Sequence, residues 1–319
     1  MVGDMYDYYP YHFFKLYYWF MRNVCLILLI FLSSGLNAEN ITFKDAEVES
    51  ICVSKWDTDG DGKLSLDEAA AVTVLGIAFK ENKSITSFEE LRFFTGLKRI
   101  NDEEFYGSSL SSVIIPPNVM EIGESAFEAT QLSGTVIVPG NVKLVNRNAF
   151  GSCYNIRRLI FEEGVEEIMN GAVSGILDYI SLPSTLTFLS AMWLNPYTSS
   201  GSSFDVTSQE FNLRVAAETP SRAATFAFVN LHGDGKLIVP FGSKELYKTT
   251  SPWKKFRKIY EVGDVNEDGF VNIADVVAVV NHILGKENAR FNELIADVNG
   301  DGTINIADVI AIIDCILSD

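Results

Sequence analysis

The chain has 319 residues, which leaves room for two or three domains of ordinary size. Its 42 acidic residues outnumber 25 basic ones, and the net charge of −17 disfavours nucleic acid and anionic membranes as partners. Many of the acids fall in three short clusters, which indicates metal ligands. The four cysteines form no C-x-x-C pair, so neither a zinc site nor a disulfide framework is expected. We expect Cys52, Cys153 and Cys315 to be buried as small apolar side chains.

Residues 1–38 have the layout of a secretory signal segment. A charged start at 21–23 precedes the short apolar run 24–32 and a small-residue exit. Nine apolar residues cannot span a bilayer, which needs about 20. We expect translation to start at Met21; if the aromatic-rich residues 1–20 are real, the whole stretch can instead be a longer, retained anchor. The segment predicts an extracellular or cell-surface location.

The first acidic cluster, 57–68, matches a twelve-residue EF-hand loop at every position. Oxygen ligands fall at positions 1, 3, 5, 9 and 12, Gly62 makes the turn at position 6, and position 7 offers its backbone carbonyl. Ca²⁺ takes six to eight oxygens, and this spacing wraps one loop around the ion. Helices are expected before the loop, with Val48 and Trp56 among their apolar residues, and after it over 69–75. The predicted ligands are Asp57, Asp59, Asp61, Lys63, Ser65 and Glu68.

Two further loops, 264–275 and 297–308, begin 33 residues apart. Each ends in Asp at position 12, where the usual EF-hand carries Glu, and each continues directly into an apolar helix, 276–284 or 309–317. Neither loop has a convincing entering helix. The chain is therefore predicted to bind three calcium ions. The ligands predicted in these loops are Asp264, Asn266, Asp268, Phe270, Asn272 and Asp275, and Asp297, Asn299, Asp301, Thr303, Asn305 and Asp308.

This duplicated loop-helix unit, over 263–319, closely resembles the type I dockerin. The resemblance implies two antiparallel, calcium-loaded helices that bind a cohesin domain. In that family the residues at loop positions 10 and 11 contact the cohesin, and here they are Ile273, Ala274, Ile306 and Ala307. The better-known pattern has hydroxyl residues there, so the partner stays open, and a purely intramolecular stabilising role is an alternative.

Between the calcium loops one phrase recurs every 21 to 24 residues. It consists of a short strand of alternating apolar residues ending near Pro, then two spaced aliphatics, then a small residue and an aromatic. The clear copies are 110–127 and 132–150, and weaker ones follow at 156–173, 177–189 and 211–228. The period lies in the leucine-rich-repeat range, and one unit cannot bury its apolar face alone. The repeated aliphatics are therefore expected to form the core of a stacked coil.

The phrase resembles the BspA-type leucine-rich repeats of surface proteins from anaerobic, host-associated bacteria, over 88–261. The EF-hand with 85–97 resembles that family's N-terminal cap, and 237–256 its closing segment. The predicted fold is multidomain and mixed α and β, with a solenoid containing a short-stranded sheet. Its parts are a signal segment (1–38), a helical EF-hand cap (39–85), the repeats (86–262) and a small all-α dockerin-like domain (263–319).

No catalytic motif stands out: there is no H-E-x-x-H, G-x-S-x-G or glycine-rich phosphate loop. Paired carboxylates for glycoside hydrolysis cannot be recognised without a fold, but the repeat already accounts for most of the middle region. We therefore expect no enzyme, no catalytic residue and no small-molecule substrate.

The preferred hypothesis is a secreted adhesion protein whose solenoid recognises a host protein or a glycan and whose dockerin attaches to a cohesin. The alternative is a non-catalytic or accessory component of an extracellular polysaccharide-degrading complex. A third hypothesis is that both calcium modules only cap the ends of the solenoid.

Overall fold

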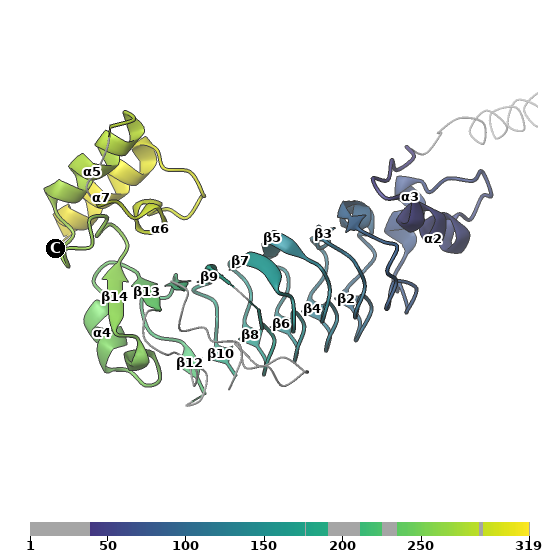
Figure 1. The fold of residues 1–319 in the computed structure, drawn as a ribbon, viewed down its shortest axis with the longest axis horizontal. Coiled ribbons are helices and arrows are strands. Elements are labelled where there is room, and N and C mark those ends of the chain that lie inside the picture. Colours follow the sequence, from purple (N-terminus) through teal and green to yellow (C-terminus); the bar gives the residue numbers. More distant parts are fainter. Residues whose placement is uncertain (1–38, 176, 191–210, 225–234, 287–289, 319) are drawn as a thin grey trace, which may run out of the picture. The chain divides into compact units, whose positions relative to one another are not determined.

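The computed structural model describes residues 39–175, 177–190, 211–224, 235–286 and 290–318. The predicted signal segment and the end of the repeat copy 211–228 lie outside these residues. The elements described below all belong to one compact unit, Ile41–Asp319, made of parallel sheets with helices before and after them (Figure 1). Within the described ranges, no helix is both long enough and apolar enough to cross a membrane.

The longer strands form a six-stranded sheet in which every neighbouring pair is parallel. Each inner strand pairs with the strand of the preceding coil and with that of the next, which is the stacking predicted for a solenoid. In order, the strands are β5 (Ser133–Val138), β7 (Asn155–Phe161), β9 (Tyr179–Leu182), β11 (Asn212–Val215), β13 (Lys236–Val239) and β14 (Lys258–Glu261).

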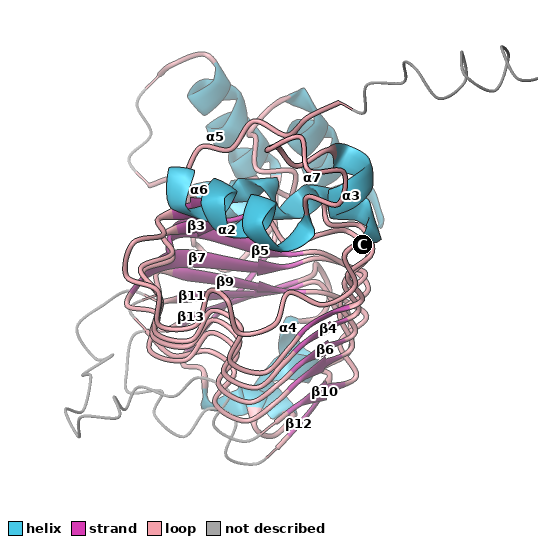
Figure 2. Cartoon of the chain, turned by 90° about the vertical axis from the view of Figure 1, so that its right-hand side faces the viewer, coloured by secondary structure: helices cyan, strands magenta, loops and turns pink. Residues whose placement is uncertain are grey.

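A second parallel sheet runs along another face of the coil (Figure 2). Its two-residue strands carry repeat aliphatics such as Ile122 and Val145, both fully buried. The sequence predicted only one strand per repeat, because a two-residue strand is too short to show a period. The strands are β2 (Arg99–Ile100), β4 (Glu121–Ile122), β6 (Leu144–Val145), β8 (Glu167–Ile168), β10 (Phe188–Leu189) and β12 (Arg222–Ala223); β1 (Ser87–Phe88) pairs separately with β3 (Ser112–Val113).

The core confirms the predicted repeat positions. The rings of Phe105, Phe127 and Phe150 stack from coil to coil, with centroids 5.1 and 5.3 Å apart and planes within 3° of parallel. Aliphatic residues at the repeat positions, such as Leu110, Val136 and Leu159, are buried, whereas Val113 at such a position has intermediate exposure. The Phe127 ring therefore contacts a ring of the coil on each side, and the core is continuous from one coil to the next.

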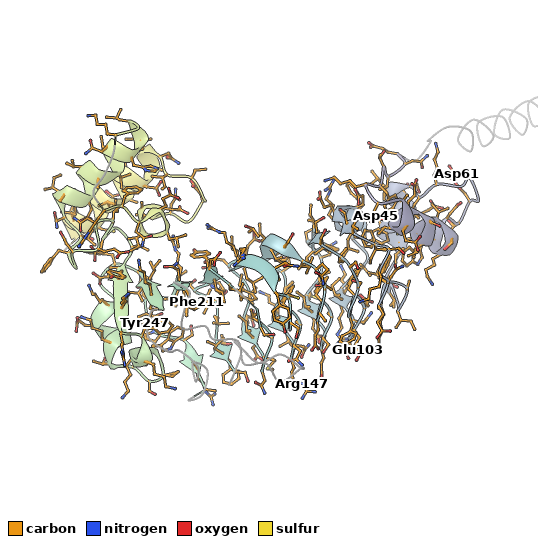
Figure 3. The ribbon with its side chains drawn as sticks, in the orientation of Figure 1. Asp45, Asp61, Glu103, Arg147, Phe211 and Tyr247 are labelled. Atoms are coloured by element: carbon orange, nitrogen blue, oxygen red, sulfur yellow. The ribbon has the colours of Figure 1, made fainter. Side chains whose placement is uncertain are left out.

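The N-terminal end of the coil is covered by α2 (Ala46–Trp56), α3 (Leu66–Ala71) and the 3-10 helix η1 (Glu89–Phe93). Asp45 caps α2 through Oδ1, which accepts from the Val48 amide at 3.2 Å, while its Oδ2 accepts from the amide and hydroxyl of Thr86 at 2.6 and 2.7 Å (Figure 3). This one carboxylate therefore ties the helix to β1.

The helix after the loop 57–68 is shorter than expected. It ends at Ala71 rather than near residue 75, and Val72 already has extended backbone. The branched residues Val72, Thr73 and Val74 disfavour helix, and Gly76 follows with φ +74°. The prediction of a helix over 69–75 was therefore wrong at its C-terminal half.

At the other end, α4 (Lys244–Thr249) and η3 (Trp253–Lys255) close the coil. The buried rings of Tyr247 and Trp253 meet edge to face at 5.3 Å, and the Tyr247 hydroxyl donates to the carbonyl of Ala217 at 2.8 Å (Figure 3). The remaining helices are α5 (Ile273–Ile283), α6 (Glu293–Ala296) and α7 (Ile306–Ser318).

Both long C-terminal helices begin three residues earlier than expected, inside the calcium loops. Asn272 and Asp275 form a capping box at the start of α5, which fixes that helix start within the loop. The cysteine prediction holds for Cys52 and Cys153, which are buried and free, whereas Cys315 on α7 is only partly buried.

The stacked phenylalanines give a stability prediction. Phe127→Ala removes a ring packed on both sides, and we expect the free energy of unfolding to fall by about 3 to 5 kcal/mol. Ile137→Ala on β5 is the control, because that side chain is 49% exposed, and it should cost less than about 1 kcal/mol. Urea unfolding followed by circular dichroism measures both, and equal losses would contradict a continuous core.

Candidate calcium sites and the surface around them

The loop 57–68 is organised by its own carboxylates. Asp57 Oδ2 accepts from the Gly62 amide at 2.9 Å, and Asp59 and Asp61 each accept from the amide two residues ahead, at 3.0 and 2.8 Å. Gly62 has φ +81°, which glycine adopts without strain. Ligand atoms of the three aspartates lie within 4.8 Å of one another. Carboxylates this close repel one another unless a cation lies between them, so the cluster fits a divalent ion.

Glu68 closes this loop. Its Oε1 accepts from the amide and hydroxyl of Thr58, at 2.6 and 2.8 Å, and its Oε2 accepts from the amide and hydroxyl of Ser65, both at 2.9 Å. Burial alone would raise the pKa of Glu68, but these hydrogen bonds outweigh it and lower the pKa to about 2. Leu64 points into the core, and its carbonyl accepts from the Ile41 amide at 2.8 Å.

In the two C-terminal loops the shorter Asp at position 12 makes the same closing bonds. Asp275 accepts from the amide of Asn272 at 3.0 Å through Oδ2 and from an amide near the loop start through Oδ1. Asp308 accepts from the amides of Asn305 at 2.9 Å and Val298 at 2.8 Å. Both aspartates are fully buried. An Asp in place of Glu therefore still joins the two ends of each loop.

Electrostatics in these loops favour a cation. Asp264 is 1% exposed, and burial raises its pKa to about 6; the hydrogen bond from the Gly269 amide opposes the rise, and the nearby charge of Asp275 adds to it. In the second loop, Asp297 Oδ1 is buried and has no hydrogen-bond partner among the described residues. A buried carboxylate oxygen without a donor is costly, and a hard cation such as Ca²⁺ removes that cost.

Each group of six predicted ligands lies around a single loop. Phe270 and Thr303 stand at position 7, where the backbone carbonyl is the expected ligand, and the Phe270 side chain is 73% exposed. Only loop 57–68 brings three carboxylates within reach of one ion among the described residues, because the other two loops carry Asn at position 3.

The helices that follow the C-terminal loops share an exposed apolar face. The four predicted contact residues at loop positions 10 and 11, Ile273, Ala274, Ile306 and Ala307, are all exposed at the starts of α5 and α7. Further along, matching positions 33 residues apart are also apolar and exposed. They are Val277 and Val280 on α5 with Leu284 at its C-cap, and Ile310, Ile313 and Leu317 on α7.

These six residues were missed by sequence reasoning. The signal was present, because both helices are apolar on more than one face, and one face suffices to pack α5 against α7 through Val279 and Ile312. A second apolar face left in water is typical of a protein-binding surface.

The C-terminal helices also contact the outward face of the long sheet. The Arg214 guanidinium on β11 donates to the carbonyls of Asp297 and Leu294, and to that of Val298 at 2.8 Å. Two of these carbonyls belong to the first two residues of the loop 297–308. One cation of the solenoid therefore holds the start of the second C-terminal calcium loop.

A second contact involves the first C-terminal loop. Lys236 on β13 lies 2.7 Å from Glu267, which also accepts from Asn292 Nδ2 at 2.6 Å. Burial raises the pKa of Glu267, but the hydrogen bonds from Lys236 and Asn292 outweigh it and lower the pKa. Beside this pair, Ile238 of β13 packs against Ile295 of α6, and both are fully buried.

Comparison with known proteins agrees with this architecture. Residues 77–195 match the BspA type Leucine rich repeat region, in six copies, and residues 262–317 match the Dockerin type I domain. The chain therefore contains a region similar to BspA-type repeats, followed by a region similar to type I dockerins. No curated protein matches the chain.

Two solved structures are similar over much of their length. A leucine rich cell surface protein from Faecalibacterium prausnitzii A2-165 is 15% identical, with 64% of this chain and 70% of that chain covered and a TM-score of 0.22. A leucine-rich repeat protein from Bacteroides ovatus ATCC 8483 is also 15% identical, with 71% and 68% covered and a TM-score of 0.25. TM-scores this low add nothing to the fold described above.

The pKa of Asp264 predicts pH-dependent calcium binding. Because Asp264 must lose its proton to bind a cation, we expect calcium affinity at the C-terminal loops to fall roughly tenfold from pH 7.5 to pH 5. Loop 57–68 should lose less, because the low pKa of Glu68 keeps it charged. In the metal-free chain, the pKa of Asp264 is higher in the folded state than in the unfolded state. Its protonated carboxyl therefore stabilises the fold below about pH 4, and this stabilisation is lost as the pH rises to about 6.

Calorimetric calcium titrations of two full-length variants measure the affinity of the C-terminal loops and that of loop 57–68 separately. One variant carries Asp57→Ala with Asp61→Ala, and the other carries Asp264→Ala with Asp297→Ala. The same pH dependence in both would contradict the assignment to Asp264.

The Arg214 contact predicts a loss of stability. Arg214→Ala leaves partly buried carbonyls without a donor, and we expect the calcium-loaded chain to lose about 1 to 3 kcal/mol of unfolding free energy. Arg147→Ala is the control, because Arg147 pairs with Glu124 on the surface and such pairs contribute at most about 1 kcal/mol. Chemical unfolding in excess calcium measures both, and an Arg214 loss no larger than the control would show that the contact contributes little.

Proposed function

We propose that this chain is a secreted, non-catalytic adhesion protein of the cell surface. Its solenoid recognises a host protein or a glycan, and its calcium-loaded dockerin attaches it to a cohesin on a partner. The observation that carries the proposal is the duplicated apolar face of α5 and α7, exposed beside two organised acidic loops. The match of 262–317 to the type I dockerin supports the same partner.

We further propose three calcium ions, one in each loop, held by the eighteen ligand residues given above. The loop 57–68 acts as an EF-hand in the N-terminal cap, within the proposed domains 39–85, 86–262 and 263–319. Bound calcium neutralises the clustered carboxylates and links folding of the loops to the metal. The side chains of Glu68, Asp275 and Asp308 join the two ends of their loops by accepting backbone hydrogen bonds.

The attachment role and the contact with the solenoid use different residues. Arg214 and Lys236 contact the calcium loops and α6, whereas the exposed apolar residues lie on α5 and α7. A stabilising role inside the chain is therefore compatible with cohesin binding, and the apolar face remains accessible.

A panel of purified type I cohesins tests the attachment. In calcium, the full-length chain should bind at least one cohesin, and Ile273→Asp combined with Ile306→Asp should weaken that binding at least roughly a hundredfold, because two central apolar contacts are lost. Ile77→Asp is the matched control, since Ile77 is 77% exposed and lies within the proposed N-terminal cap 39–85. Biolayer interferometry with and without a chelator measures each affinity.

The attachment proposal fails if no cohesin binds in calcium, or if the double variant binds as well as the parent. A cohesin from a scaffold that also carries glycosidases would place the chain in a polysaccharide-degrading complex.

A further inference from the structure

A row of polar side chains crosses the outward face of the long sheet and ends beneath α6. Strand register places Arg158 of β7 beside Tyr179 of β9, then Asn212 of β11, then Lys236 of β13. Together with the segment around α6 this row encloses a cleft of about 730 Å³, within the size range of small-ligand sites.

Arg158 is prepared to bind an anion. Its guanidinium carbon lies 4.6 Å from the centroid of the Tyr179 ring, and it has no hydrogen bond or ion pair with any other described residue. Stacking on the Tyr179 ring holds the planar guanidinium in place and leaves its N–H groups free to donate hydrogen bonds to an anion. Tyr179 is 6% exposed, so it forms the floor of the cleft beneath the cation.

Asn212 supplies the complementary group. Its Nδ2 donates to the carbonyl of Asp178 at 3.3 Å, while its Oδ1 is buried and has no partner among the described residues. An unpaired buried acceptor favours a ligand with a donor such as a hydroxyl. Arg158 and Asn212 stand two strands apart, or about 10 Å at the spacing of parallel strands. That separation suits two linked sugar units.

The other cations that line the cleft differ in how far they are neutralised. Lys236 pairs with Glu267 at 2.7 Å, and Arg157 lies 3.7 Å from Asp178, whereas the exposed Arg290 adds positive charge to the same cleft. Glu293 and Asp297 also line the cleft, and we have proposed that Asp297 binds calcium, which removes its charge from the balance. An anionic ligand therefore meets least repulsion in the calcium-loaded chain.

We propose that this cleft binds an acidic oligosaccharide of the uronic acid class, with a carboxylate on Arg158 and a hydroxyl on Asn212. The inference rests on the proposed function of the solenoid as a binding module and names its ligand class. A peptide fits less well, because β7, β9 and β11 are each paired on both sides and offer no strand edge in the cleft.

A comparison of trigalacturonate with the neutral galactotriose tests whether binding depends on the carboxylates or on the sugar alone. In one calcium-containing buffer, the full-length chain should bind trigalacturonate saturably and galactotriose at least about tenfold more weakly. Arg158→Gln should weaken trigalacturonate binding at least about tenfold, because it removes a charged donor. Asn212→Ala should weaken both ligands severalfold.

Arg92→Gln is the matched control, because the Arg92 guanidinium lies over the Phe93 ring at the same distance, 4.6 Å, in η1. It should leave trigalacturonate binding unchanged. Isothermal calorimetry measures the affinities, and thermal melting shows that each variant is folded.

The proposal is overturned if trigalacturonate gives no saturable heat, if galactotriose binds equally well, or if a folded Arg158→Gln variant binds like the parent. Hexaglutamate bound more tightly than trigalacturonate would also overturn it, in favour of an acidic peptide. The double variant at Ile273 and Ile306 should keep trigalacturonate binding. A chain that binds trigalacturonate but no cohesin therefore refutes the attachment alone, and the reverse result refutes the cleft alone.

Discussion

The stacking of each coil on the next is the constraint from which the rest of this structure follows. A single repeat is too small to bury its own apolar side chains, so the rings of Phe105, Phe127 and Phe150 find their partners only in neighbouring coils. The same stacking keeps the strands parallel and in register. Outward-facing side chains therefore also form rows, and the row from Arg158 to Lys236 is one of them.

Stacking leaves two open ends, and acidic loops occur near both. At the N-terminal end, a single loop of the EF-hand pattern is joined to its surroundings through the Ile41 amide and the Leu64 carbonyl. Near the C-terminal end, the loops depend on solenoid side chains, because Arg214 holds the backbone of one and Lys236 pairs with a side chain of the other. Calcium binding and solenoid packing are therefore expected to support each other.

In the proposed function, the C-terminal segment 263–319 uses separate surfaces for attachment to a partner and for contact with the solenoid. Ile295 of α6 is buried against the last strands, whereas the apolar positions repeated 33 residues apart on α5 and α7 remain in water. A small domain can afford an exposed apolar face when its loops and its contact with a larger neighbour fix its fold. The hypotheses of attachment and of end capping therefore describe two faces of one domain.

The sequence alone determined the features that depend on local spacing: the repeat, its buried aliphatics, and the three acidic loops, whose predicted ligands follow one another within twelve residues. Local spacing was misleading only where helix ends are set by neighbouring residues, as at Val72 and Asn272. Tertiary structure alone decided the second sheet, the contact of Arg214 with the loop 297–308, and the meeting of Arg158, Tyr179 and Asn212 in one cleft. The reason is physical, because these groups lie about twenty to eighty residues apart and only the stacking of coils and the docking of α6 bring them together.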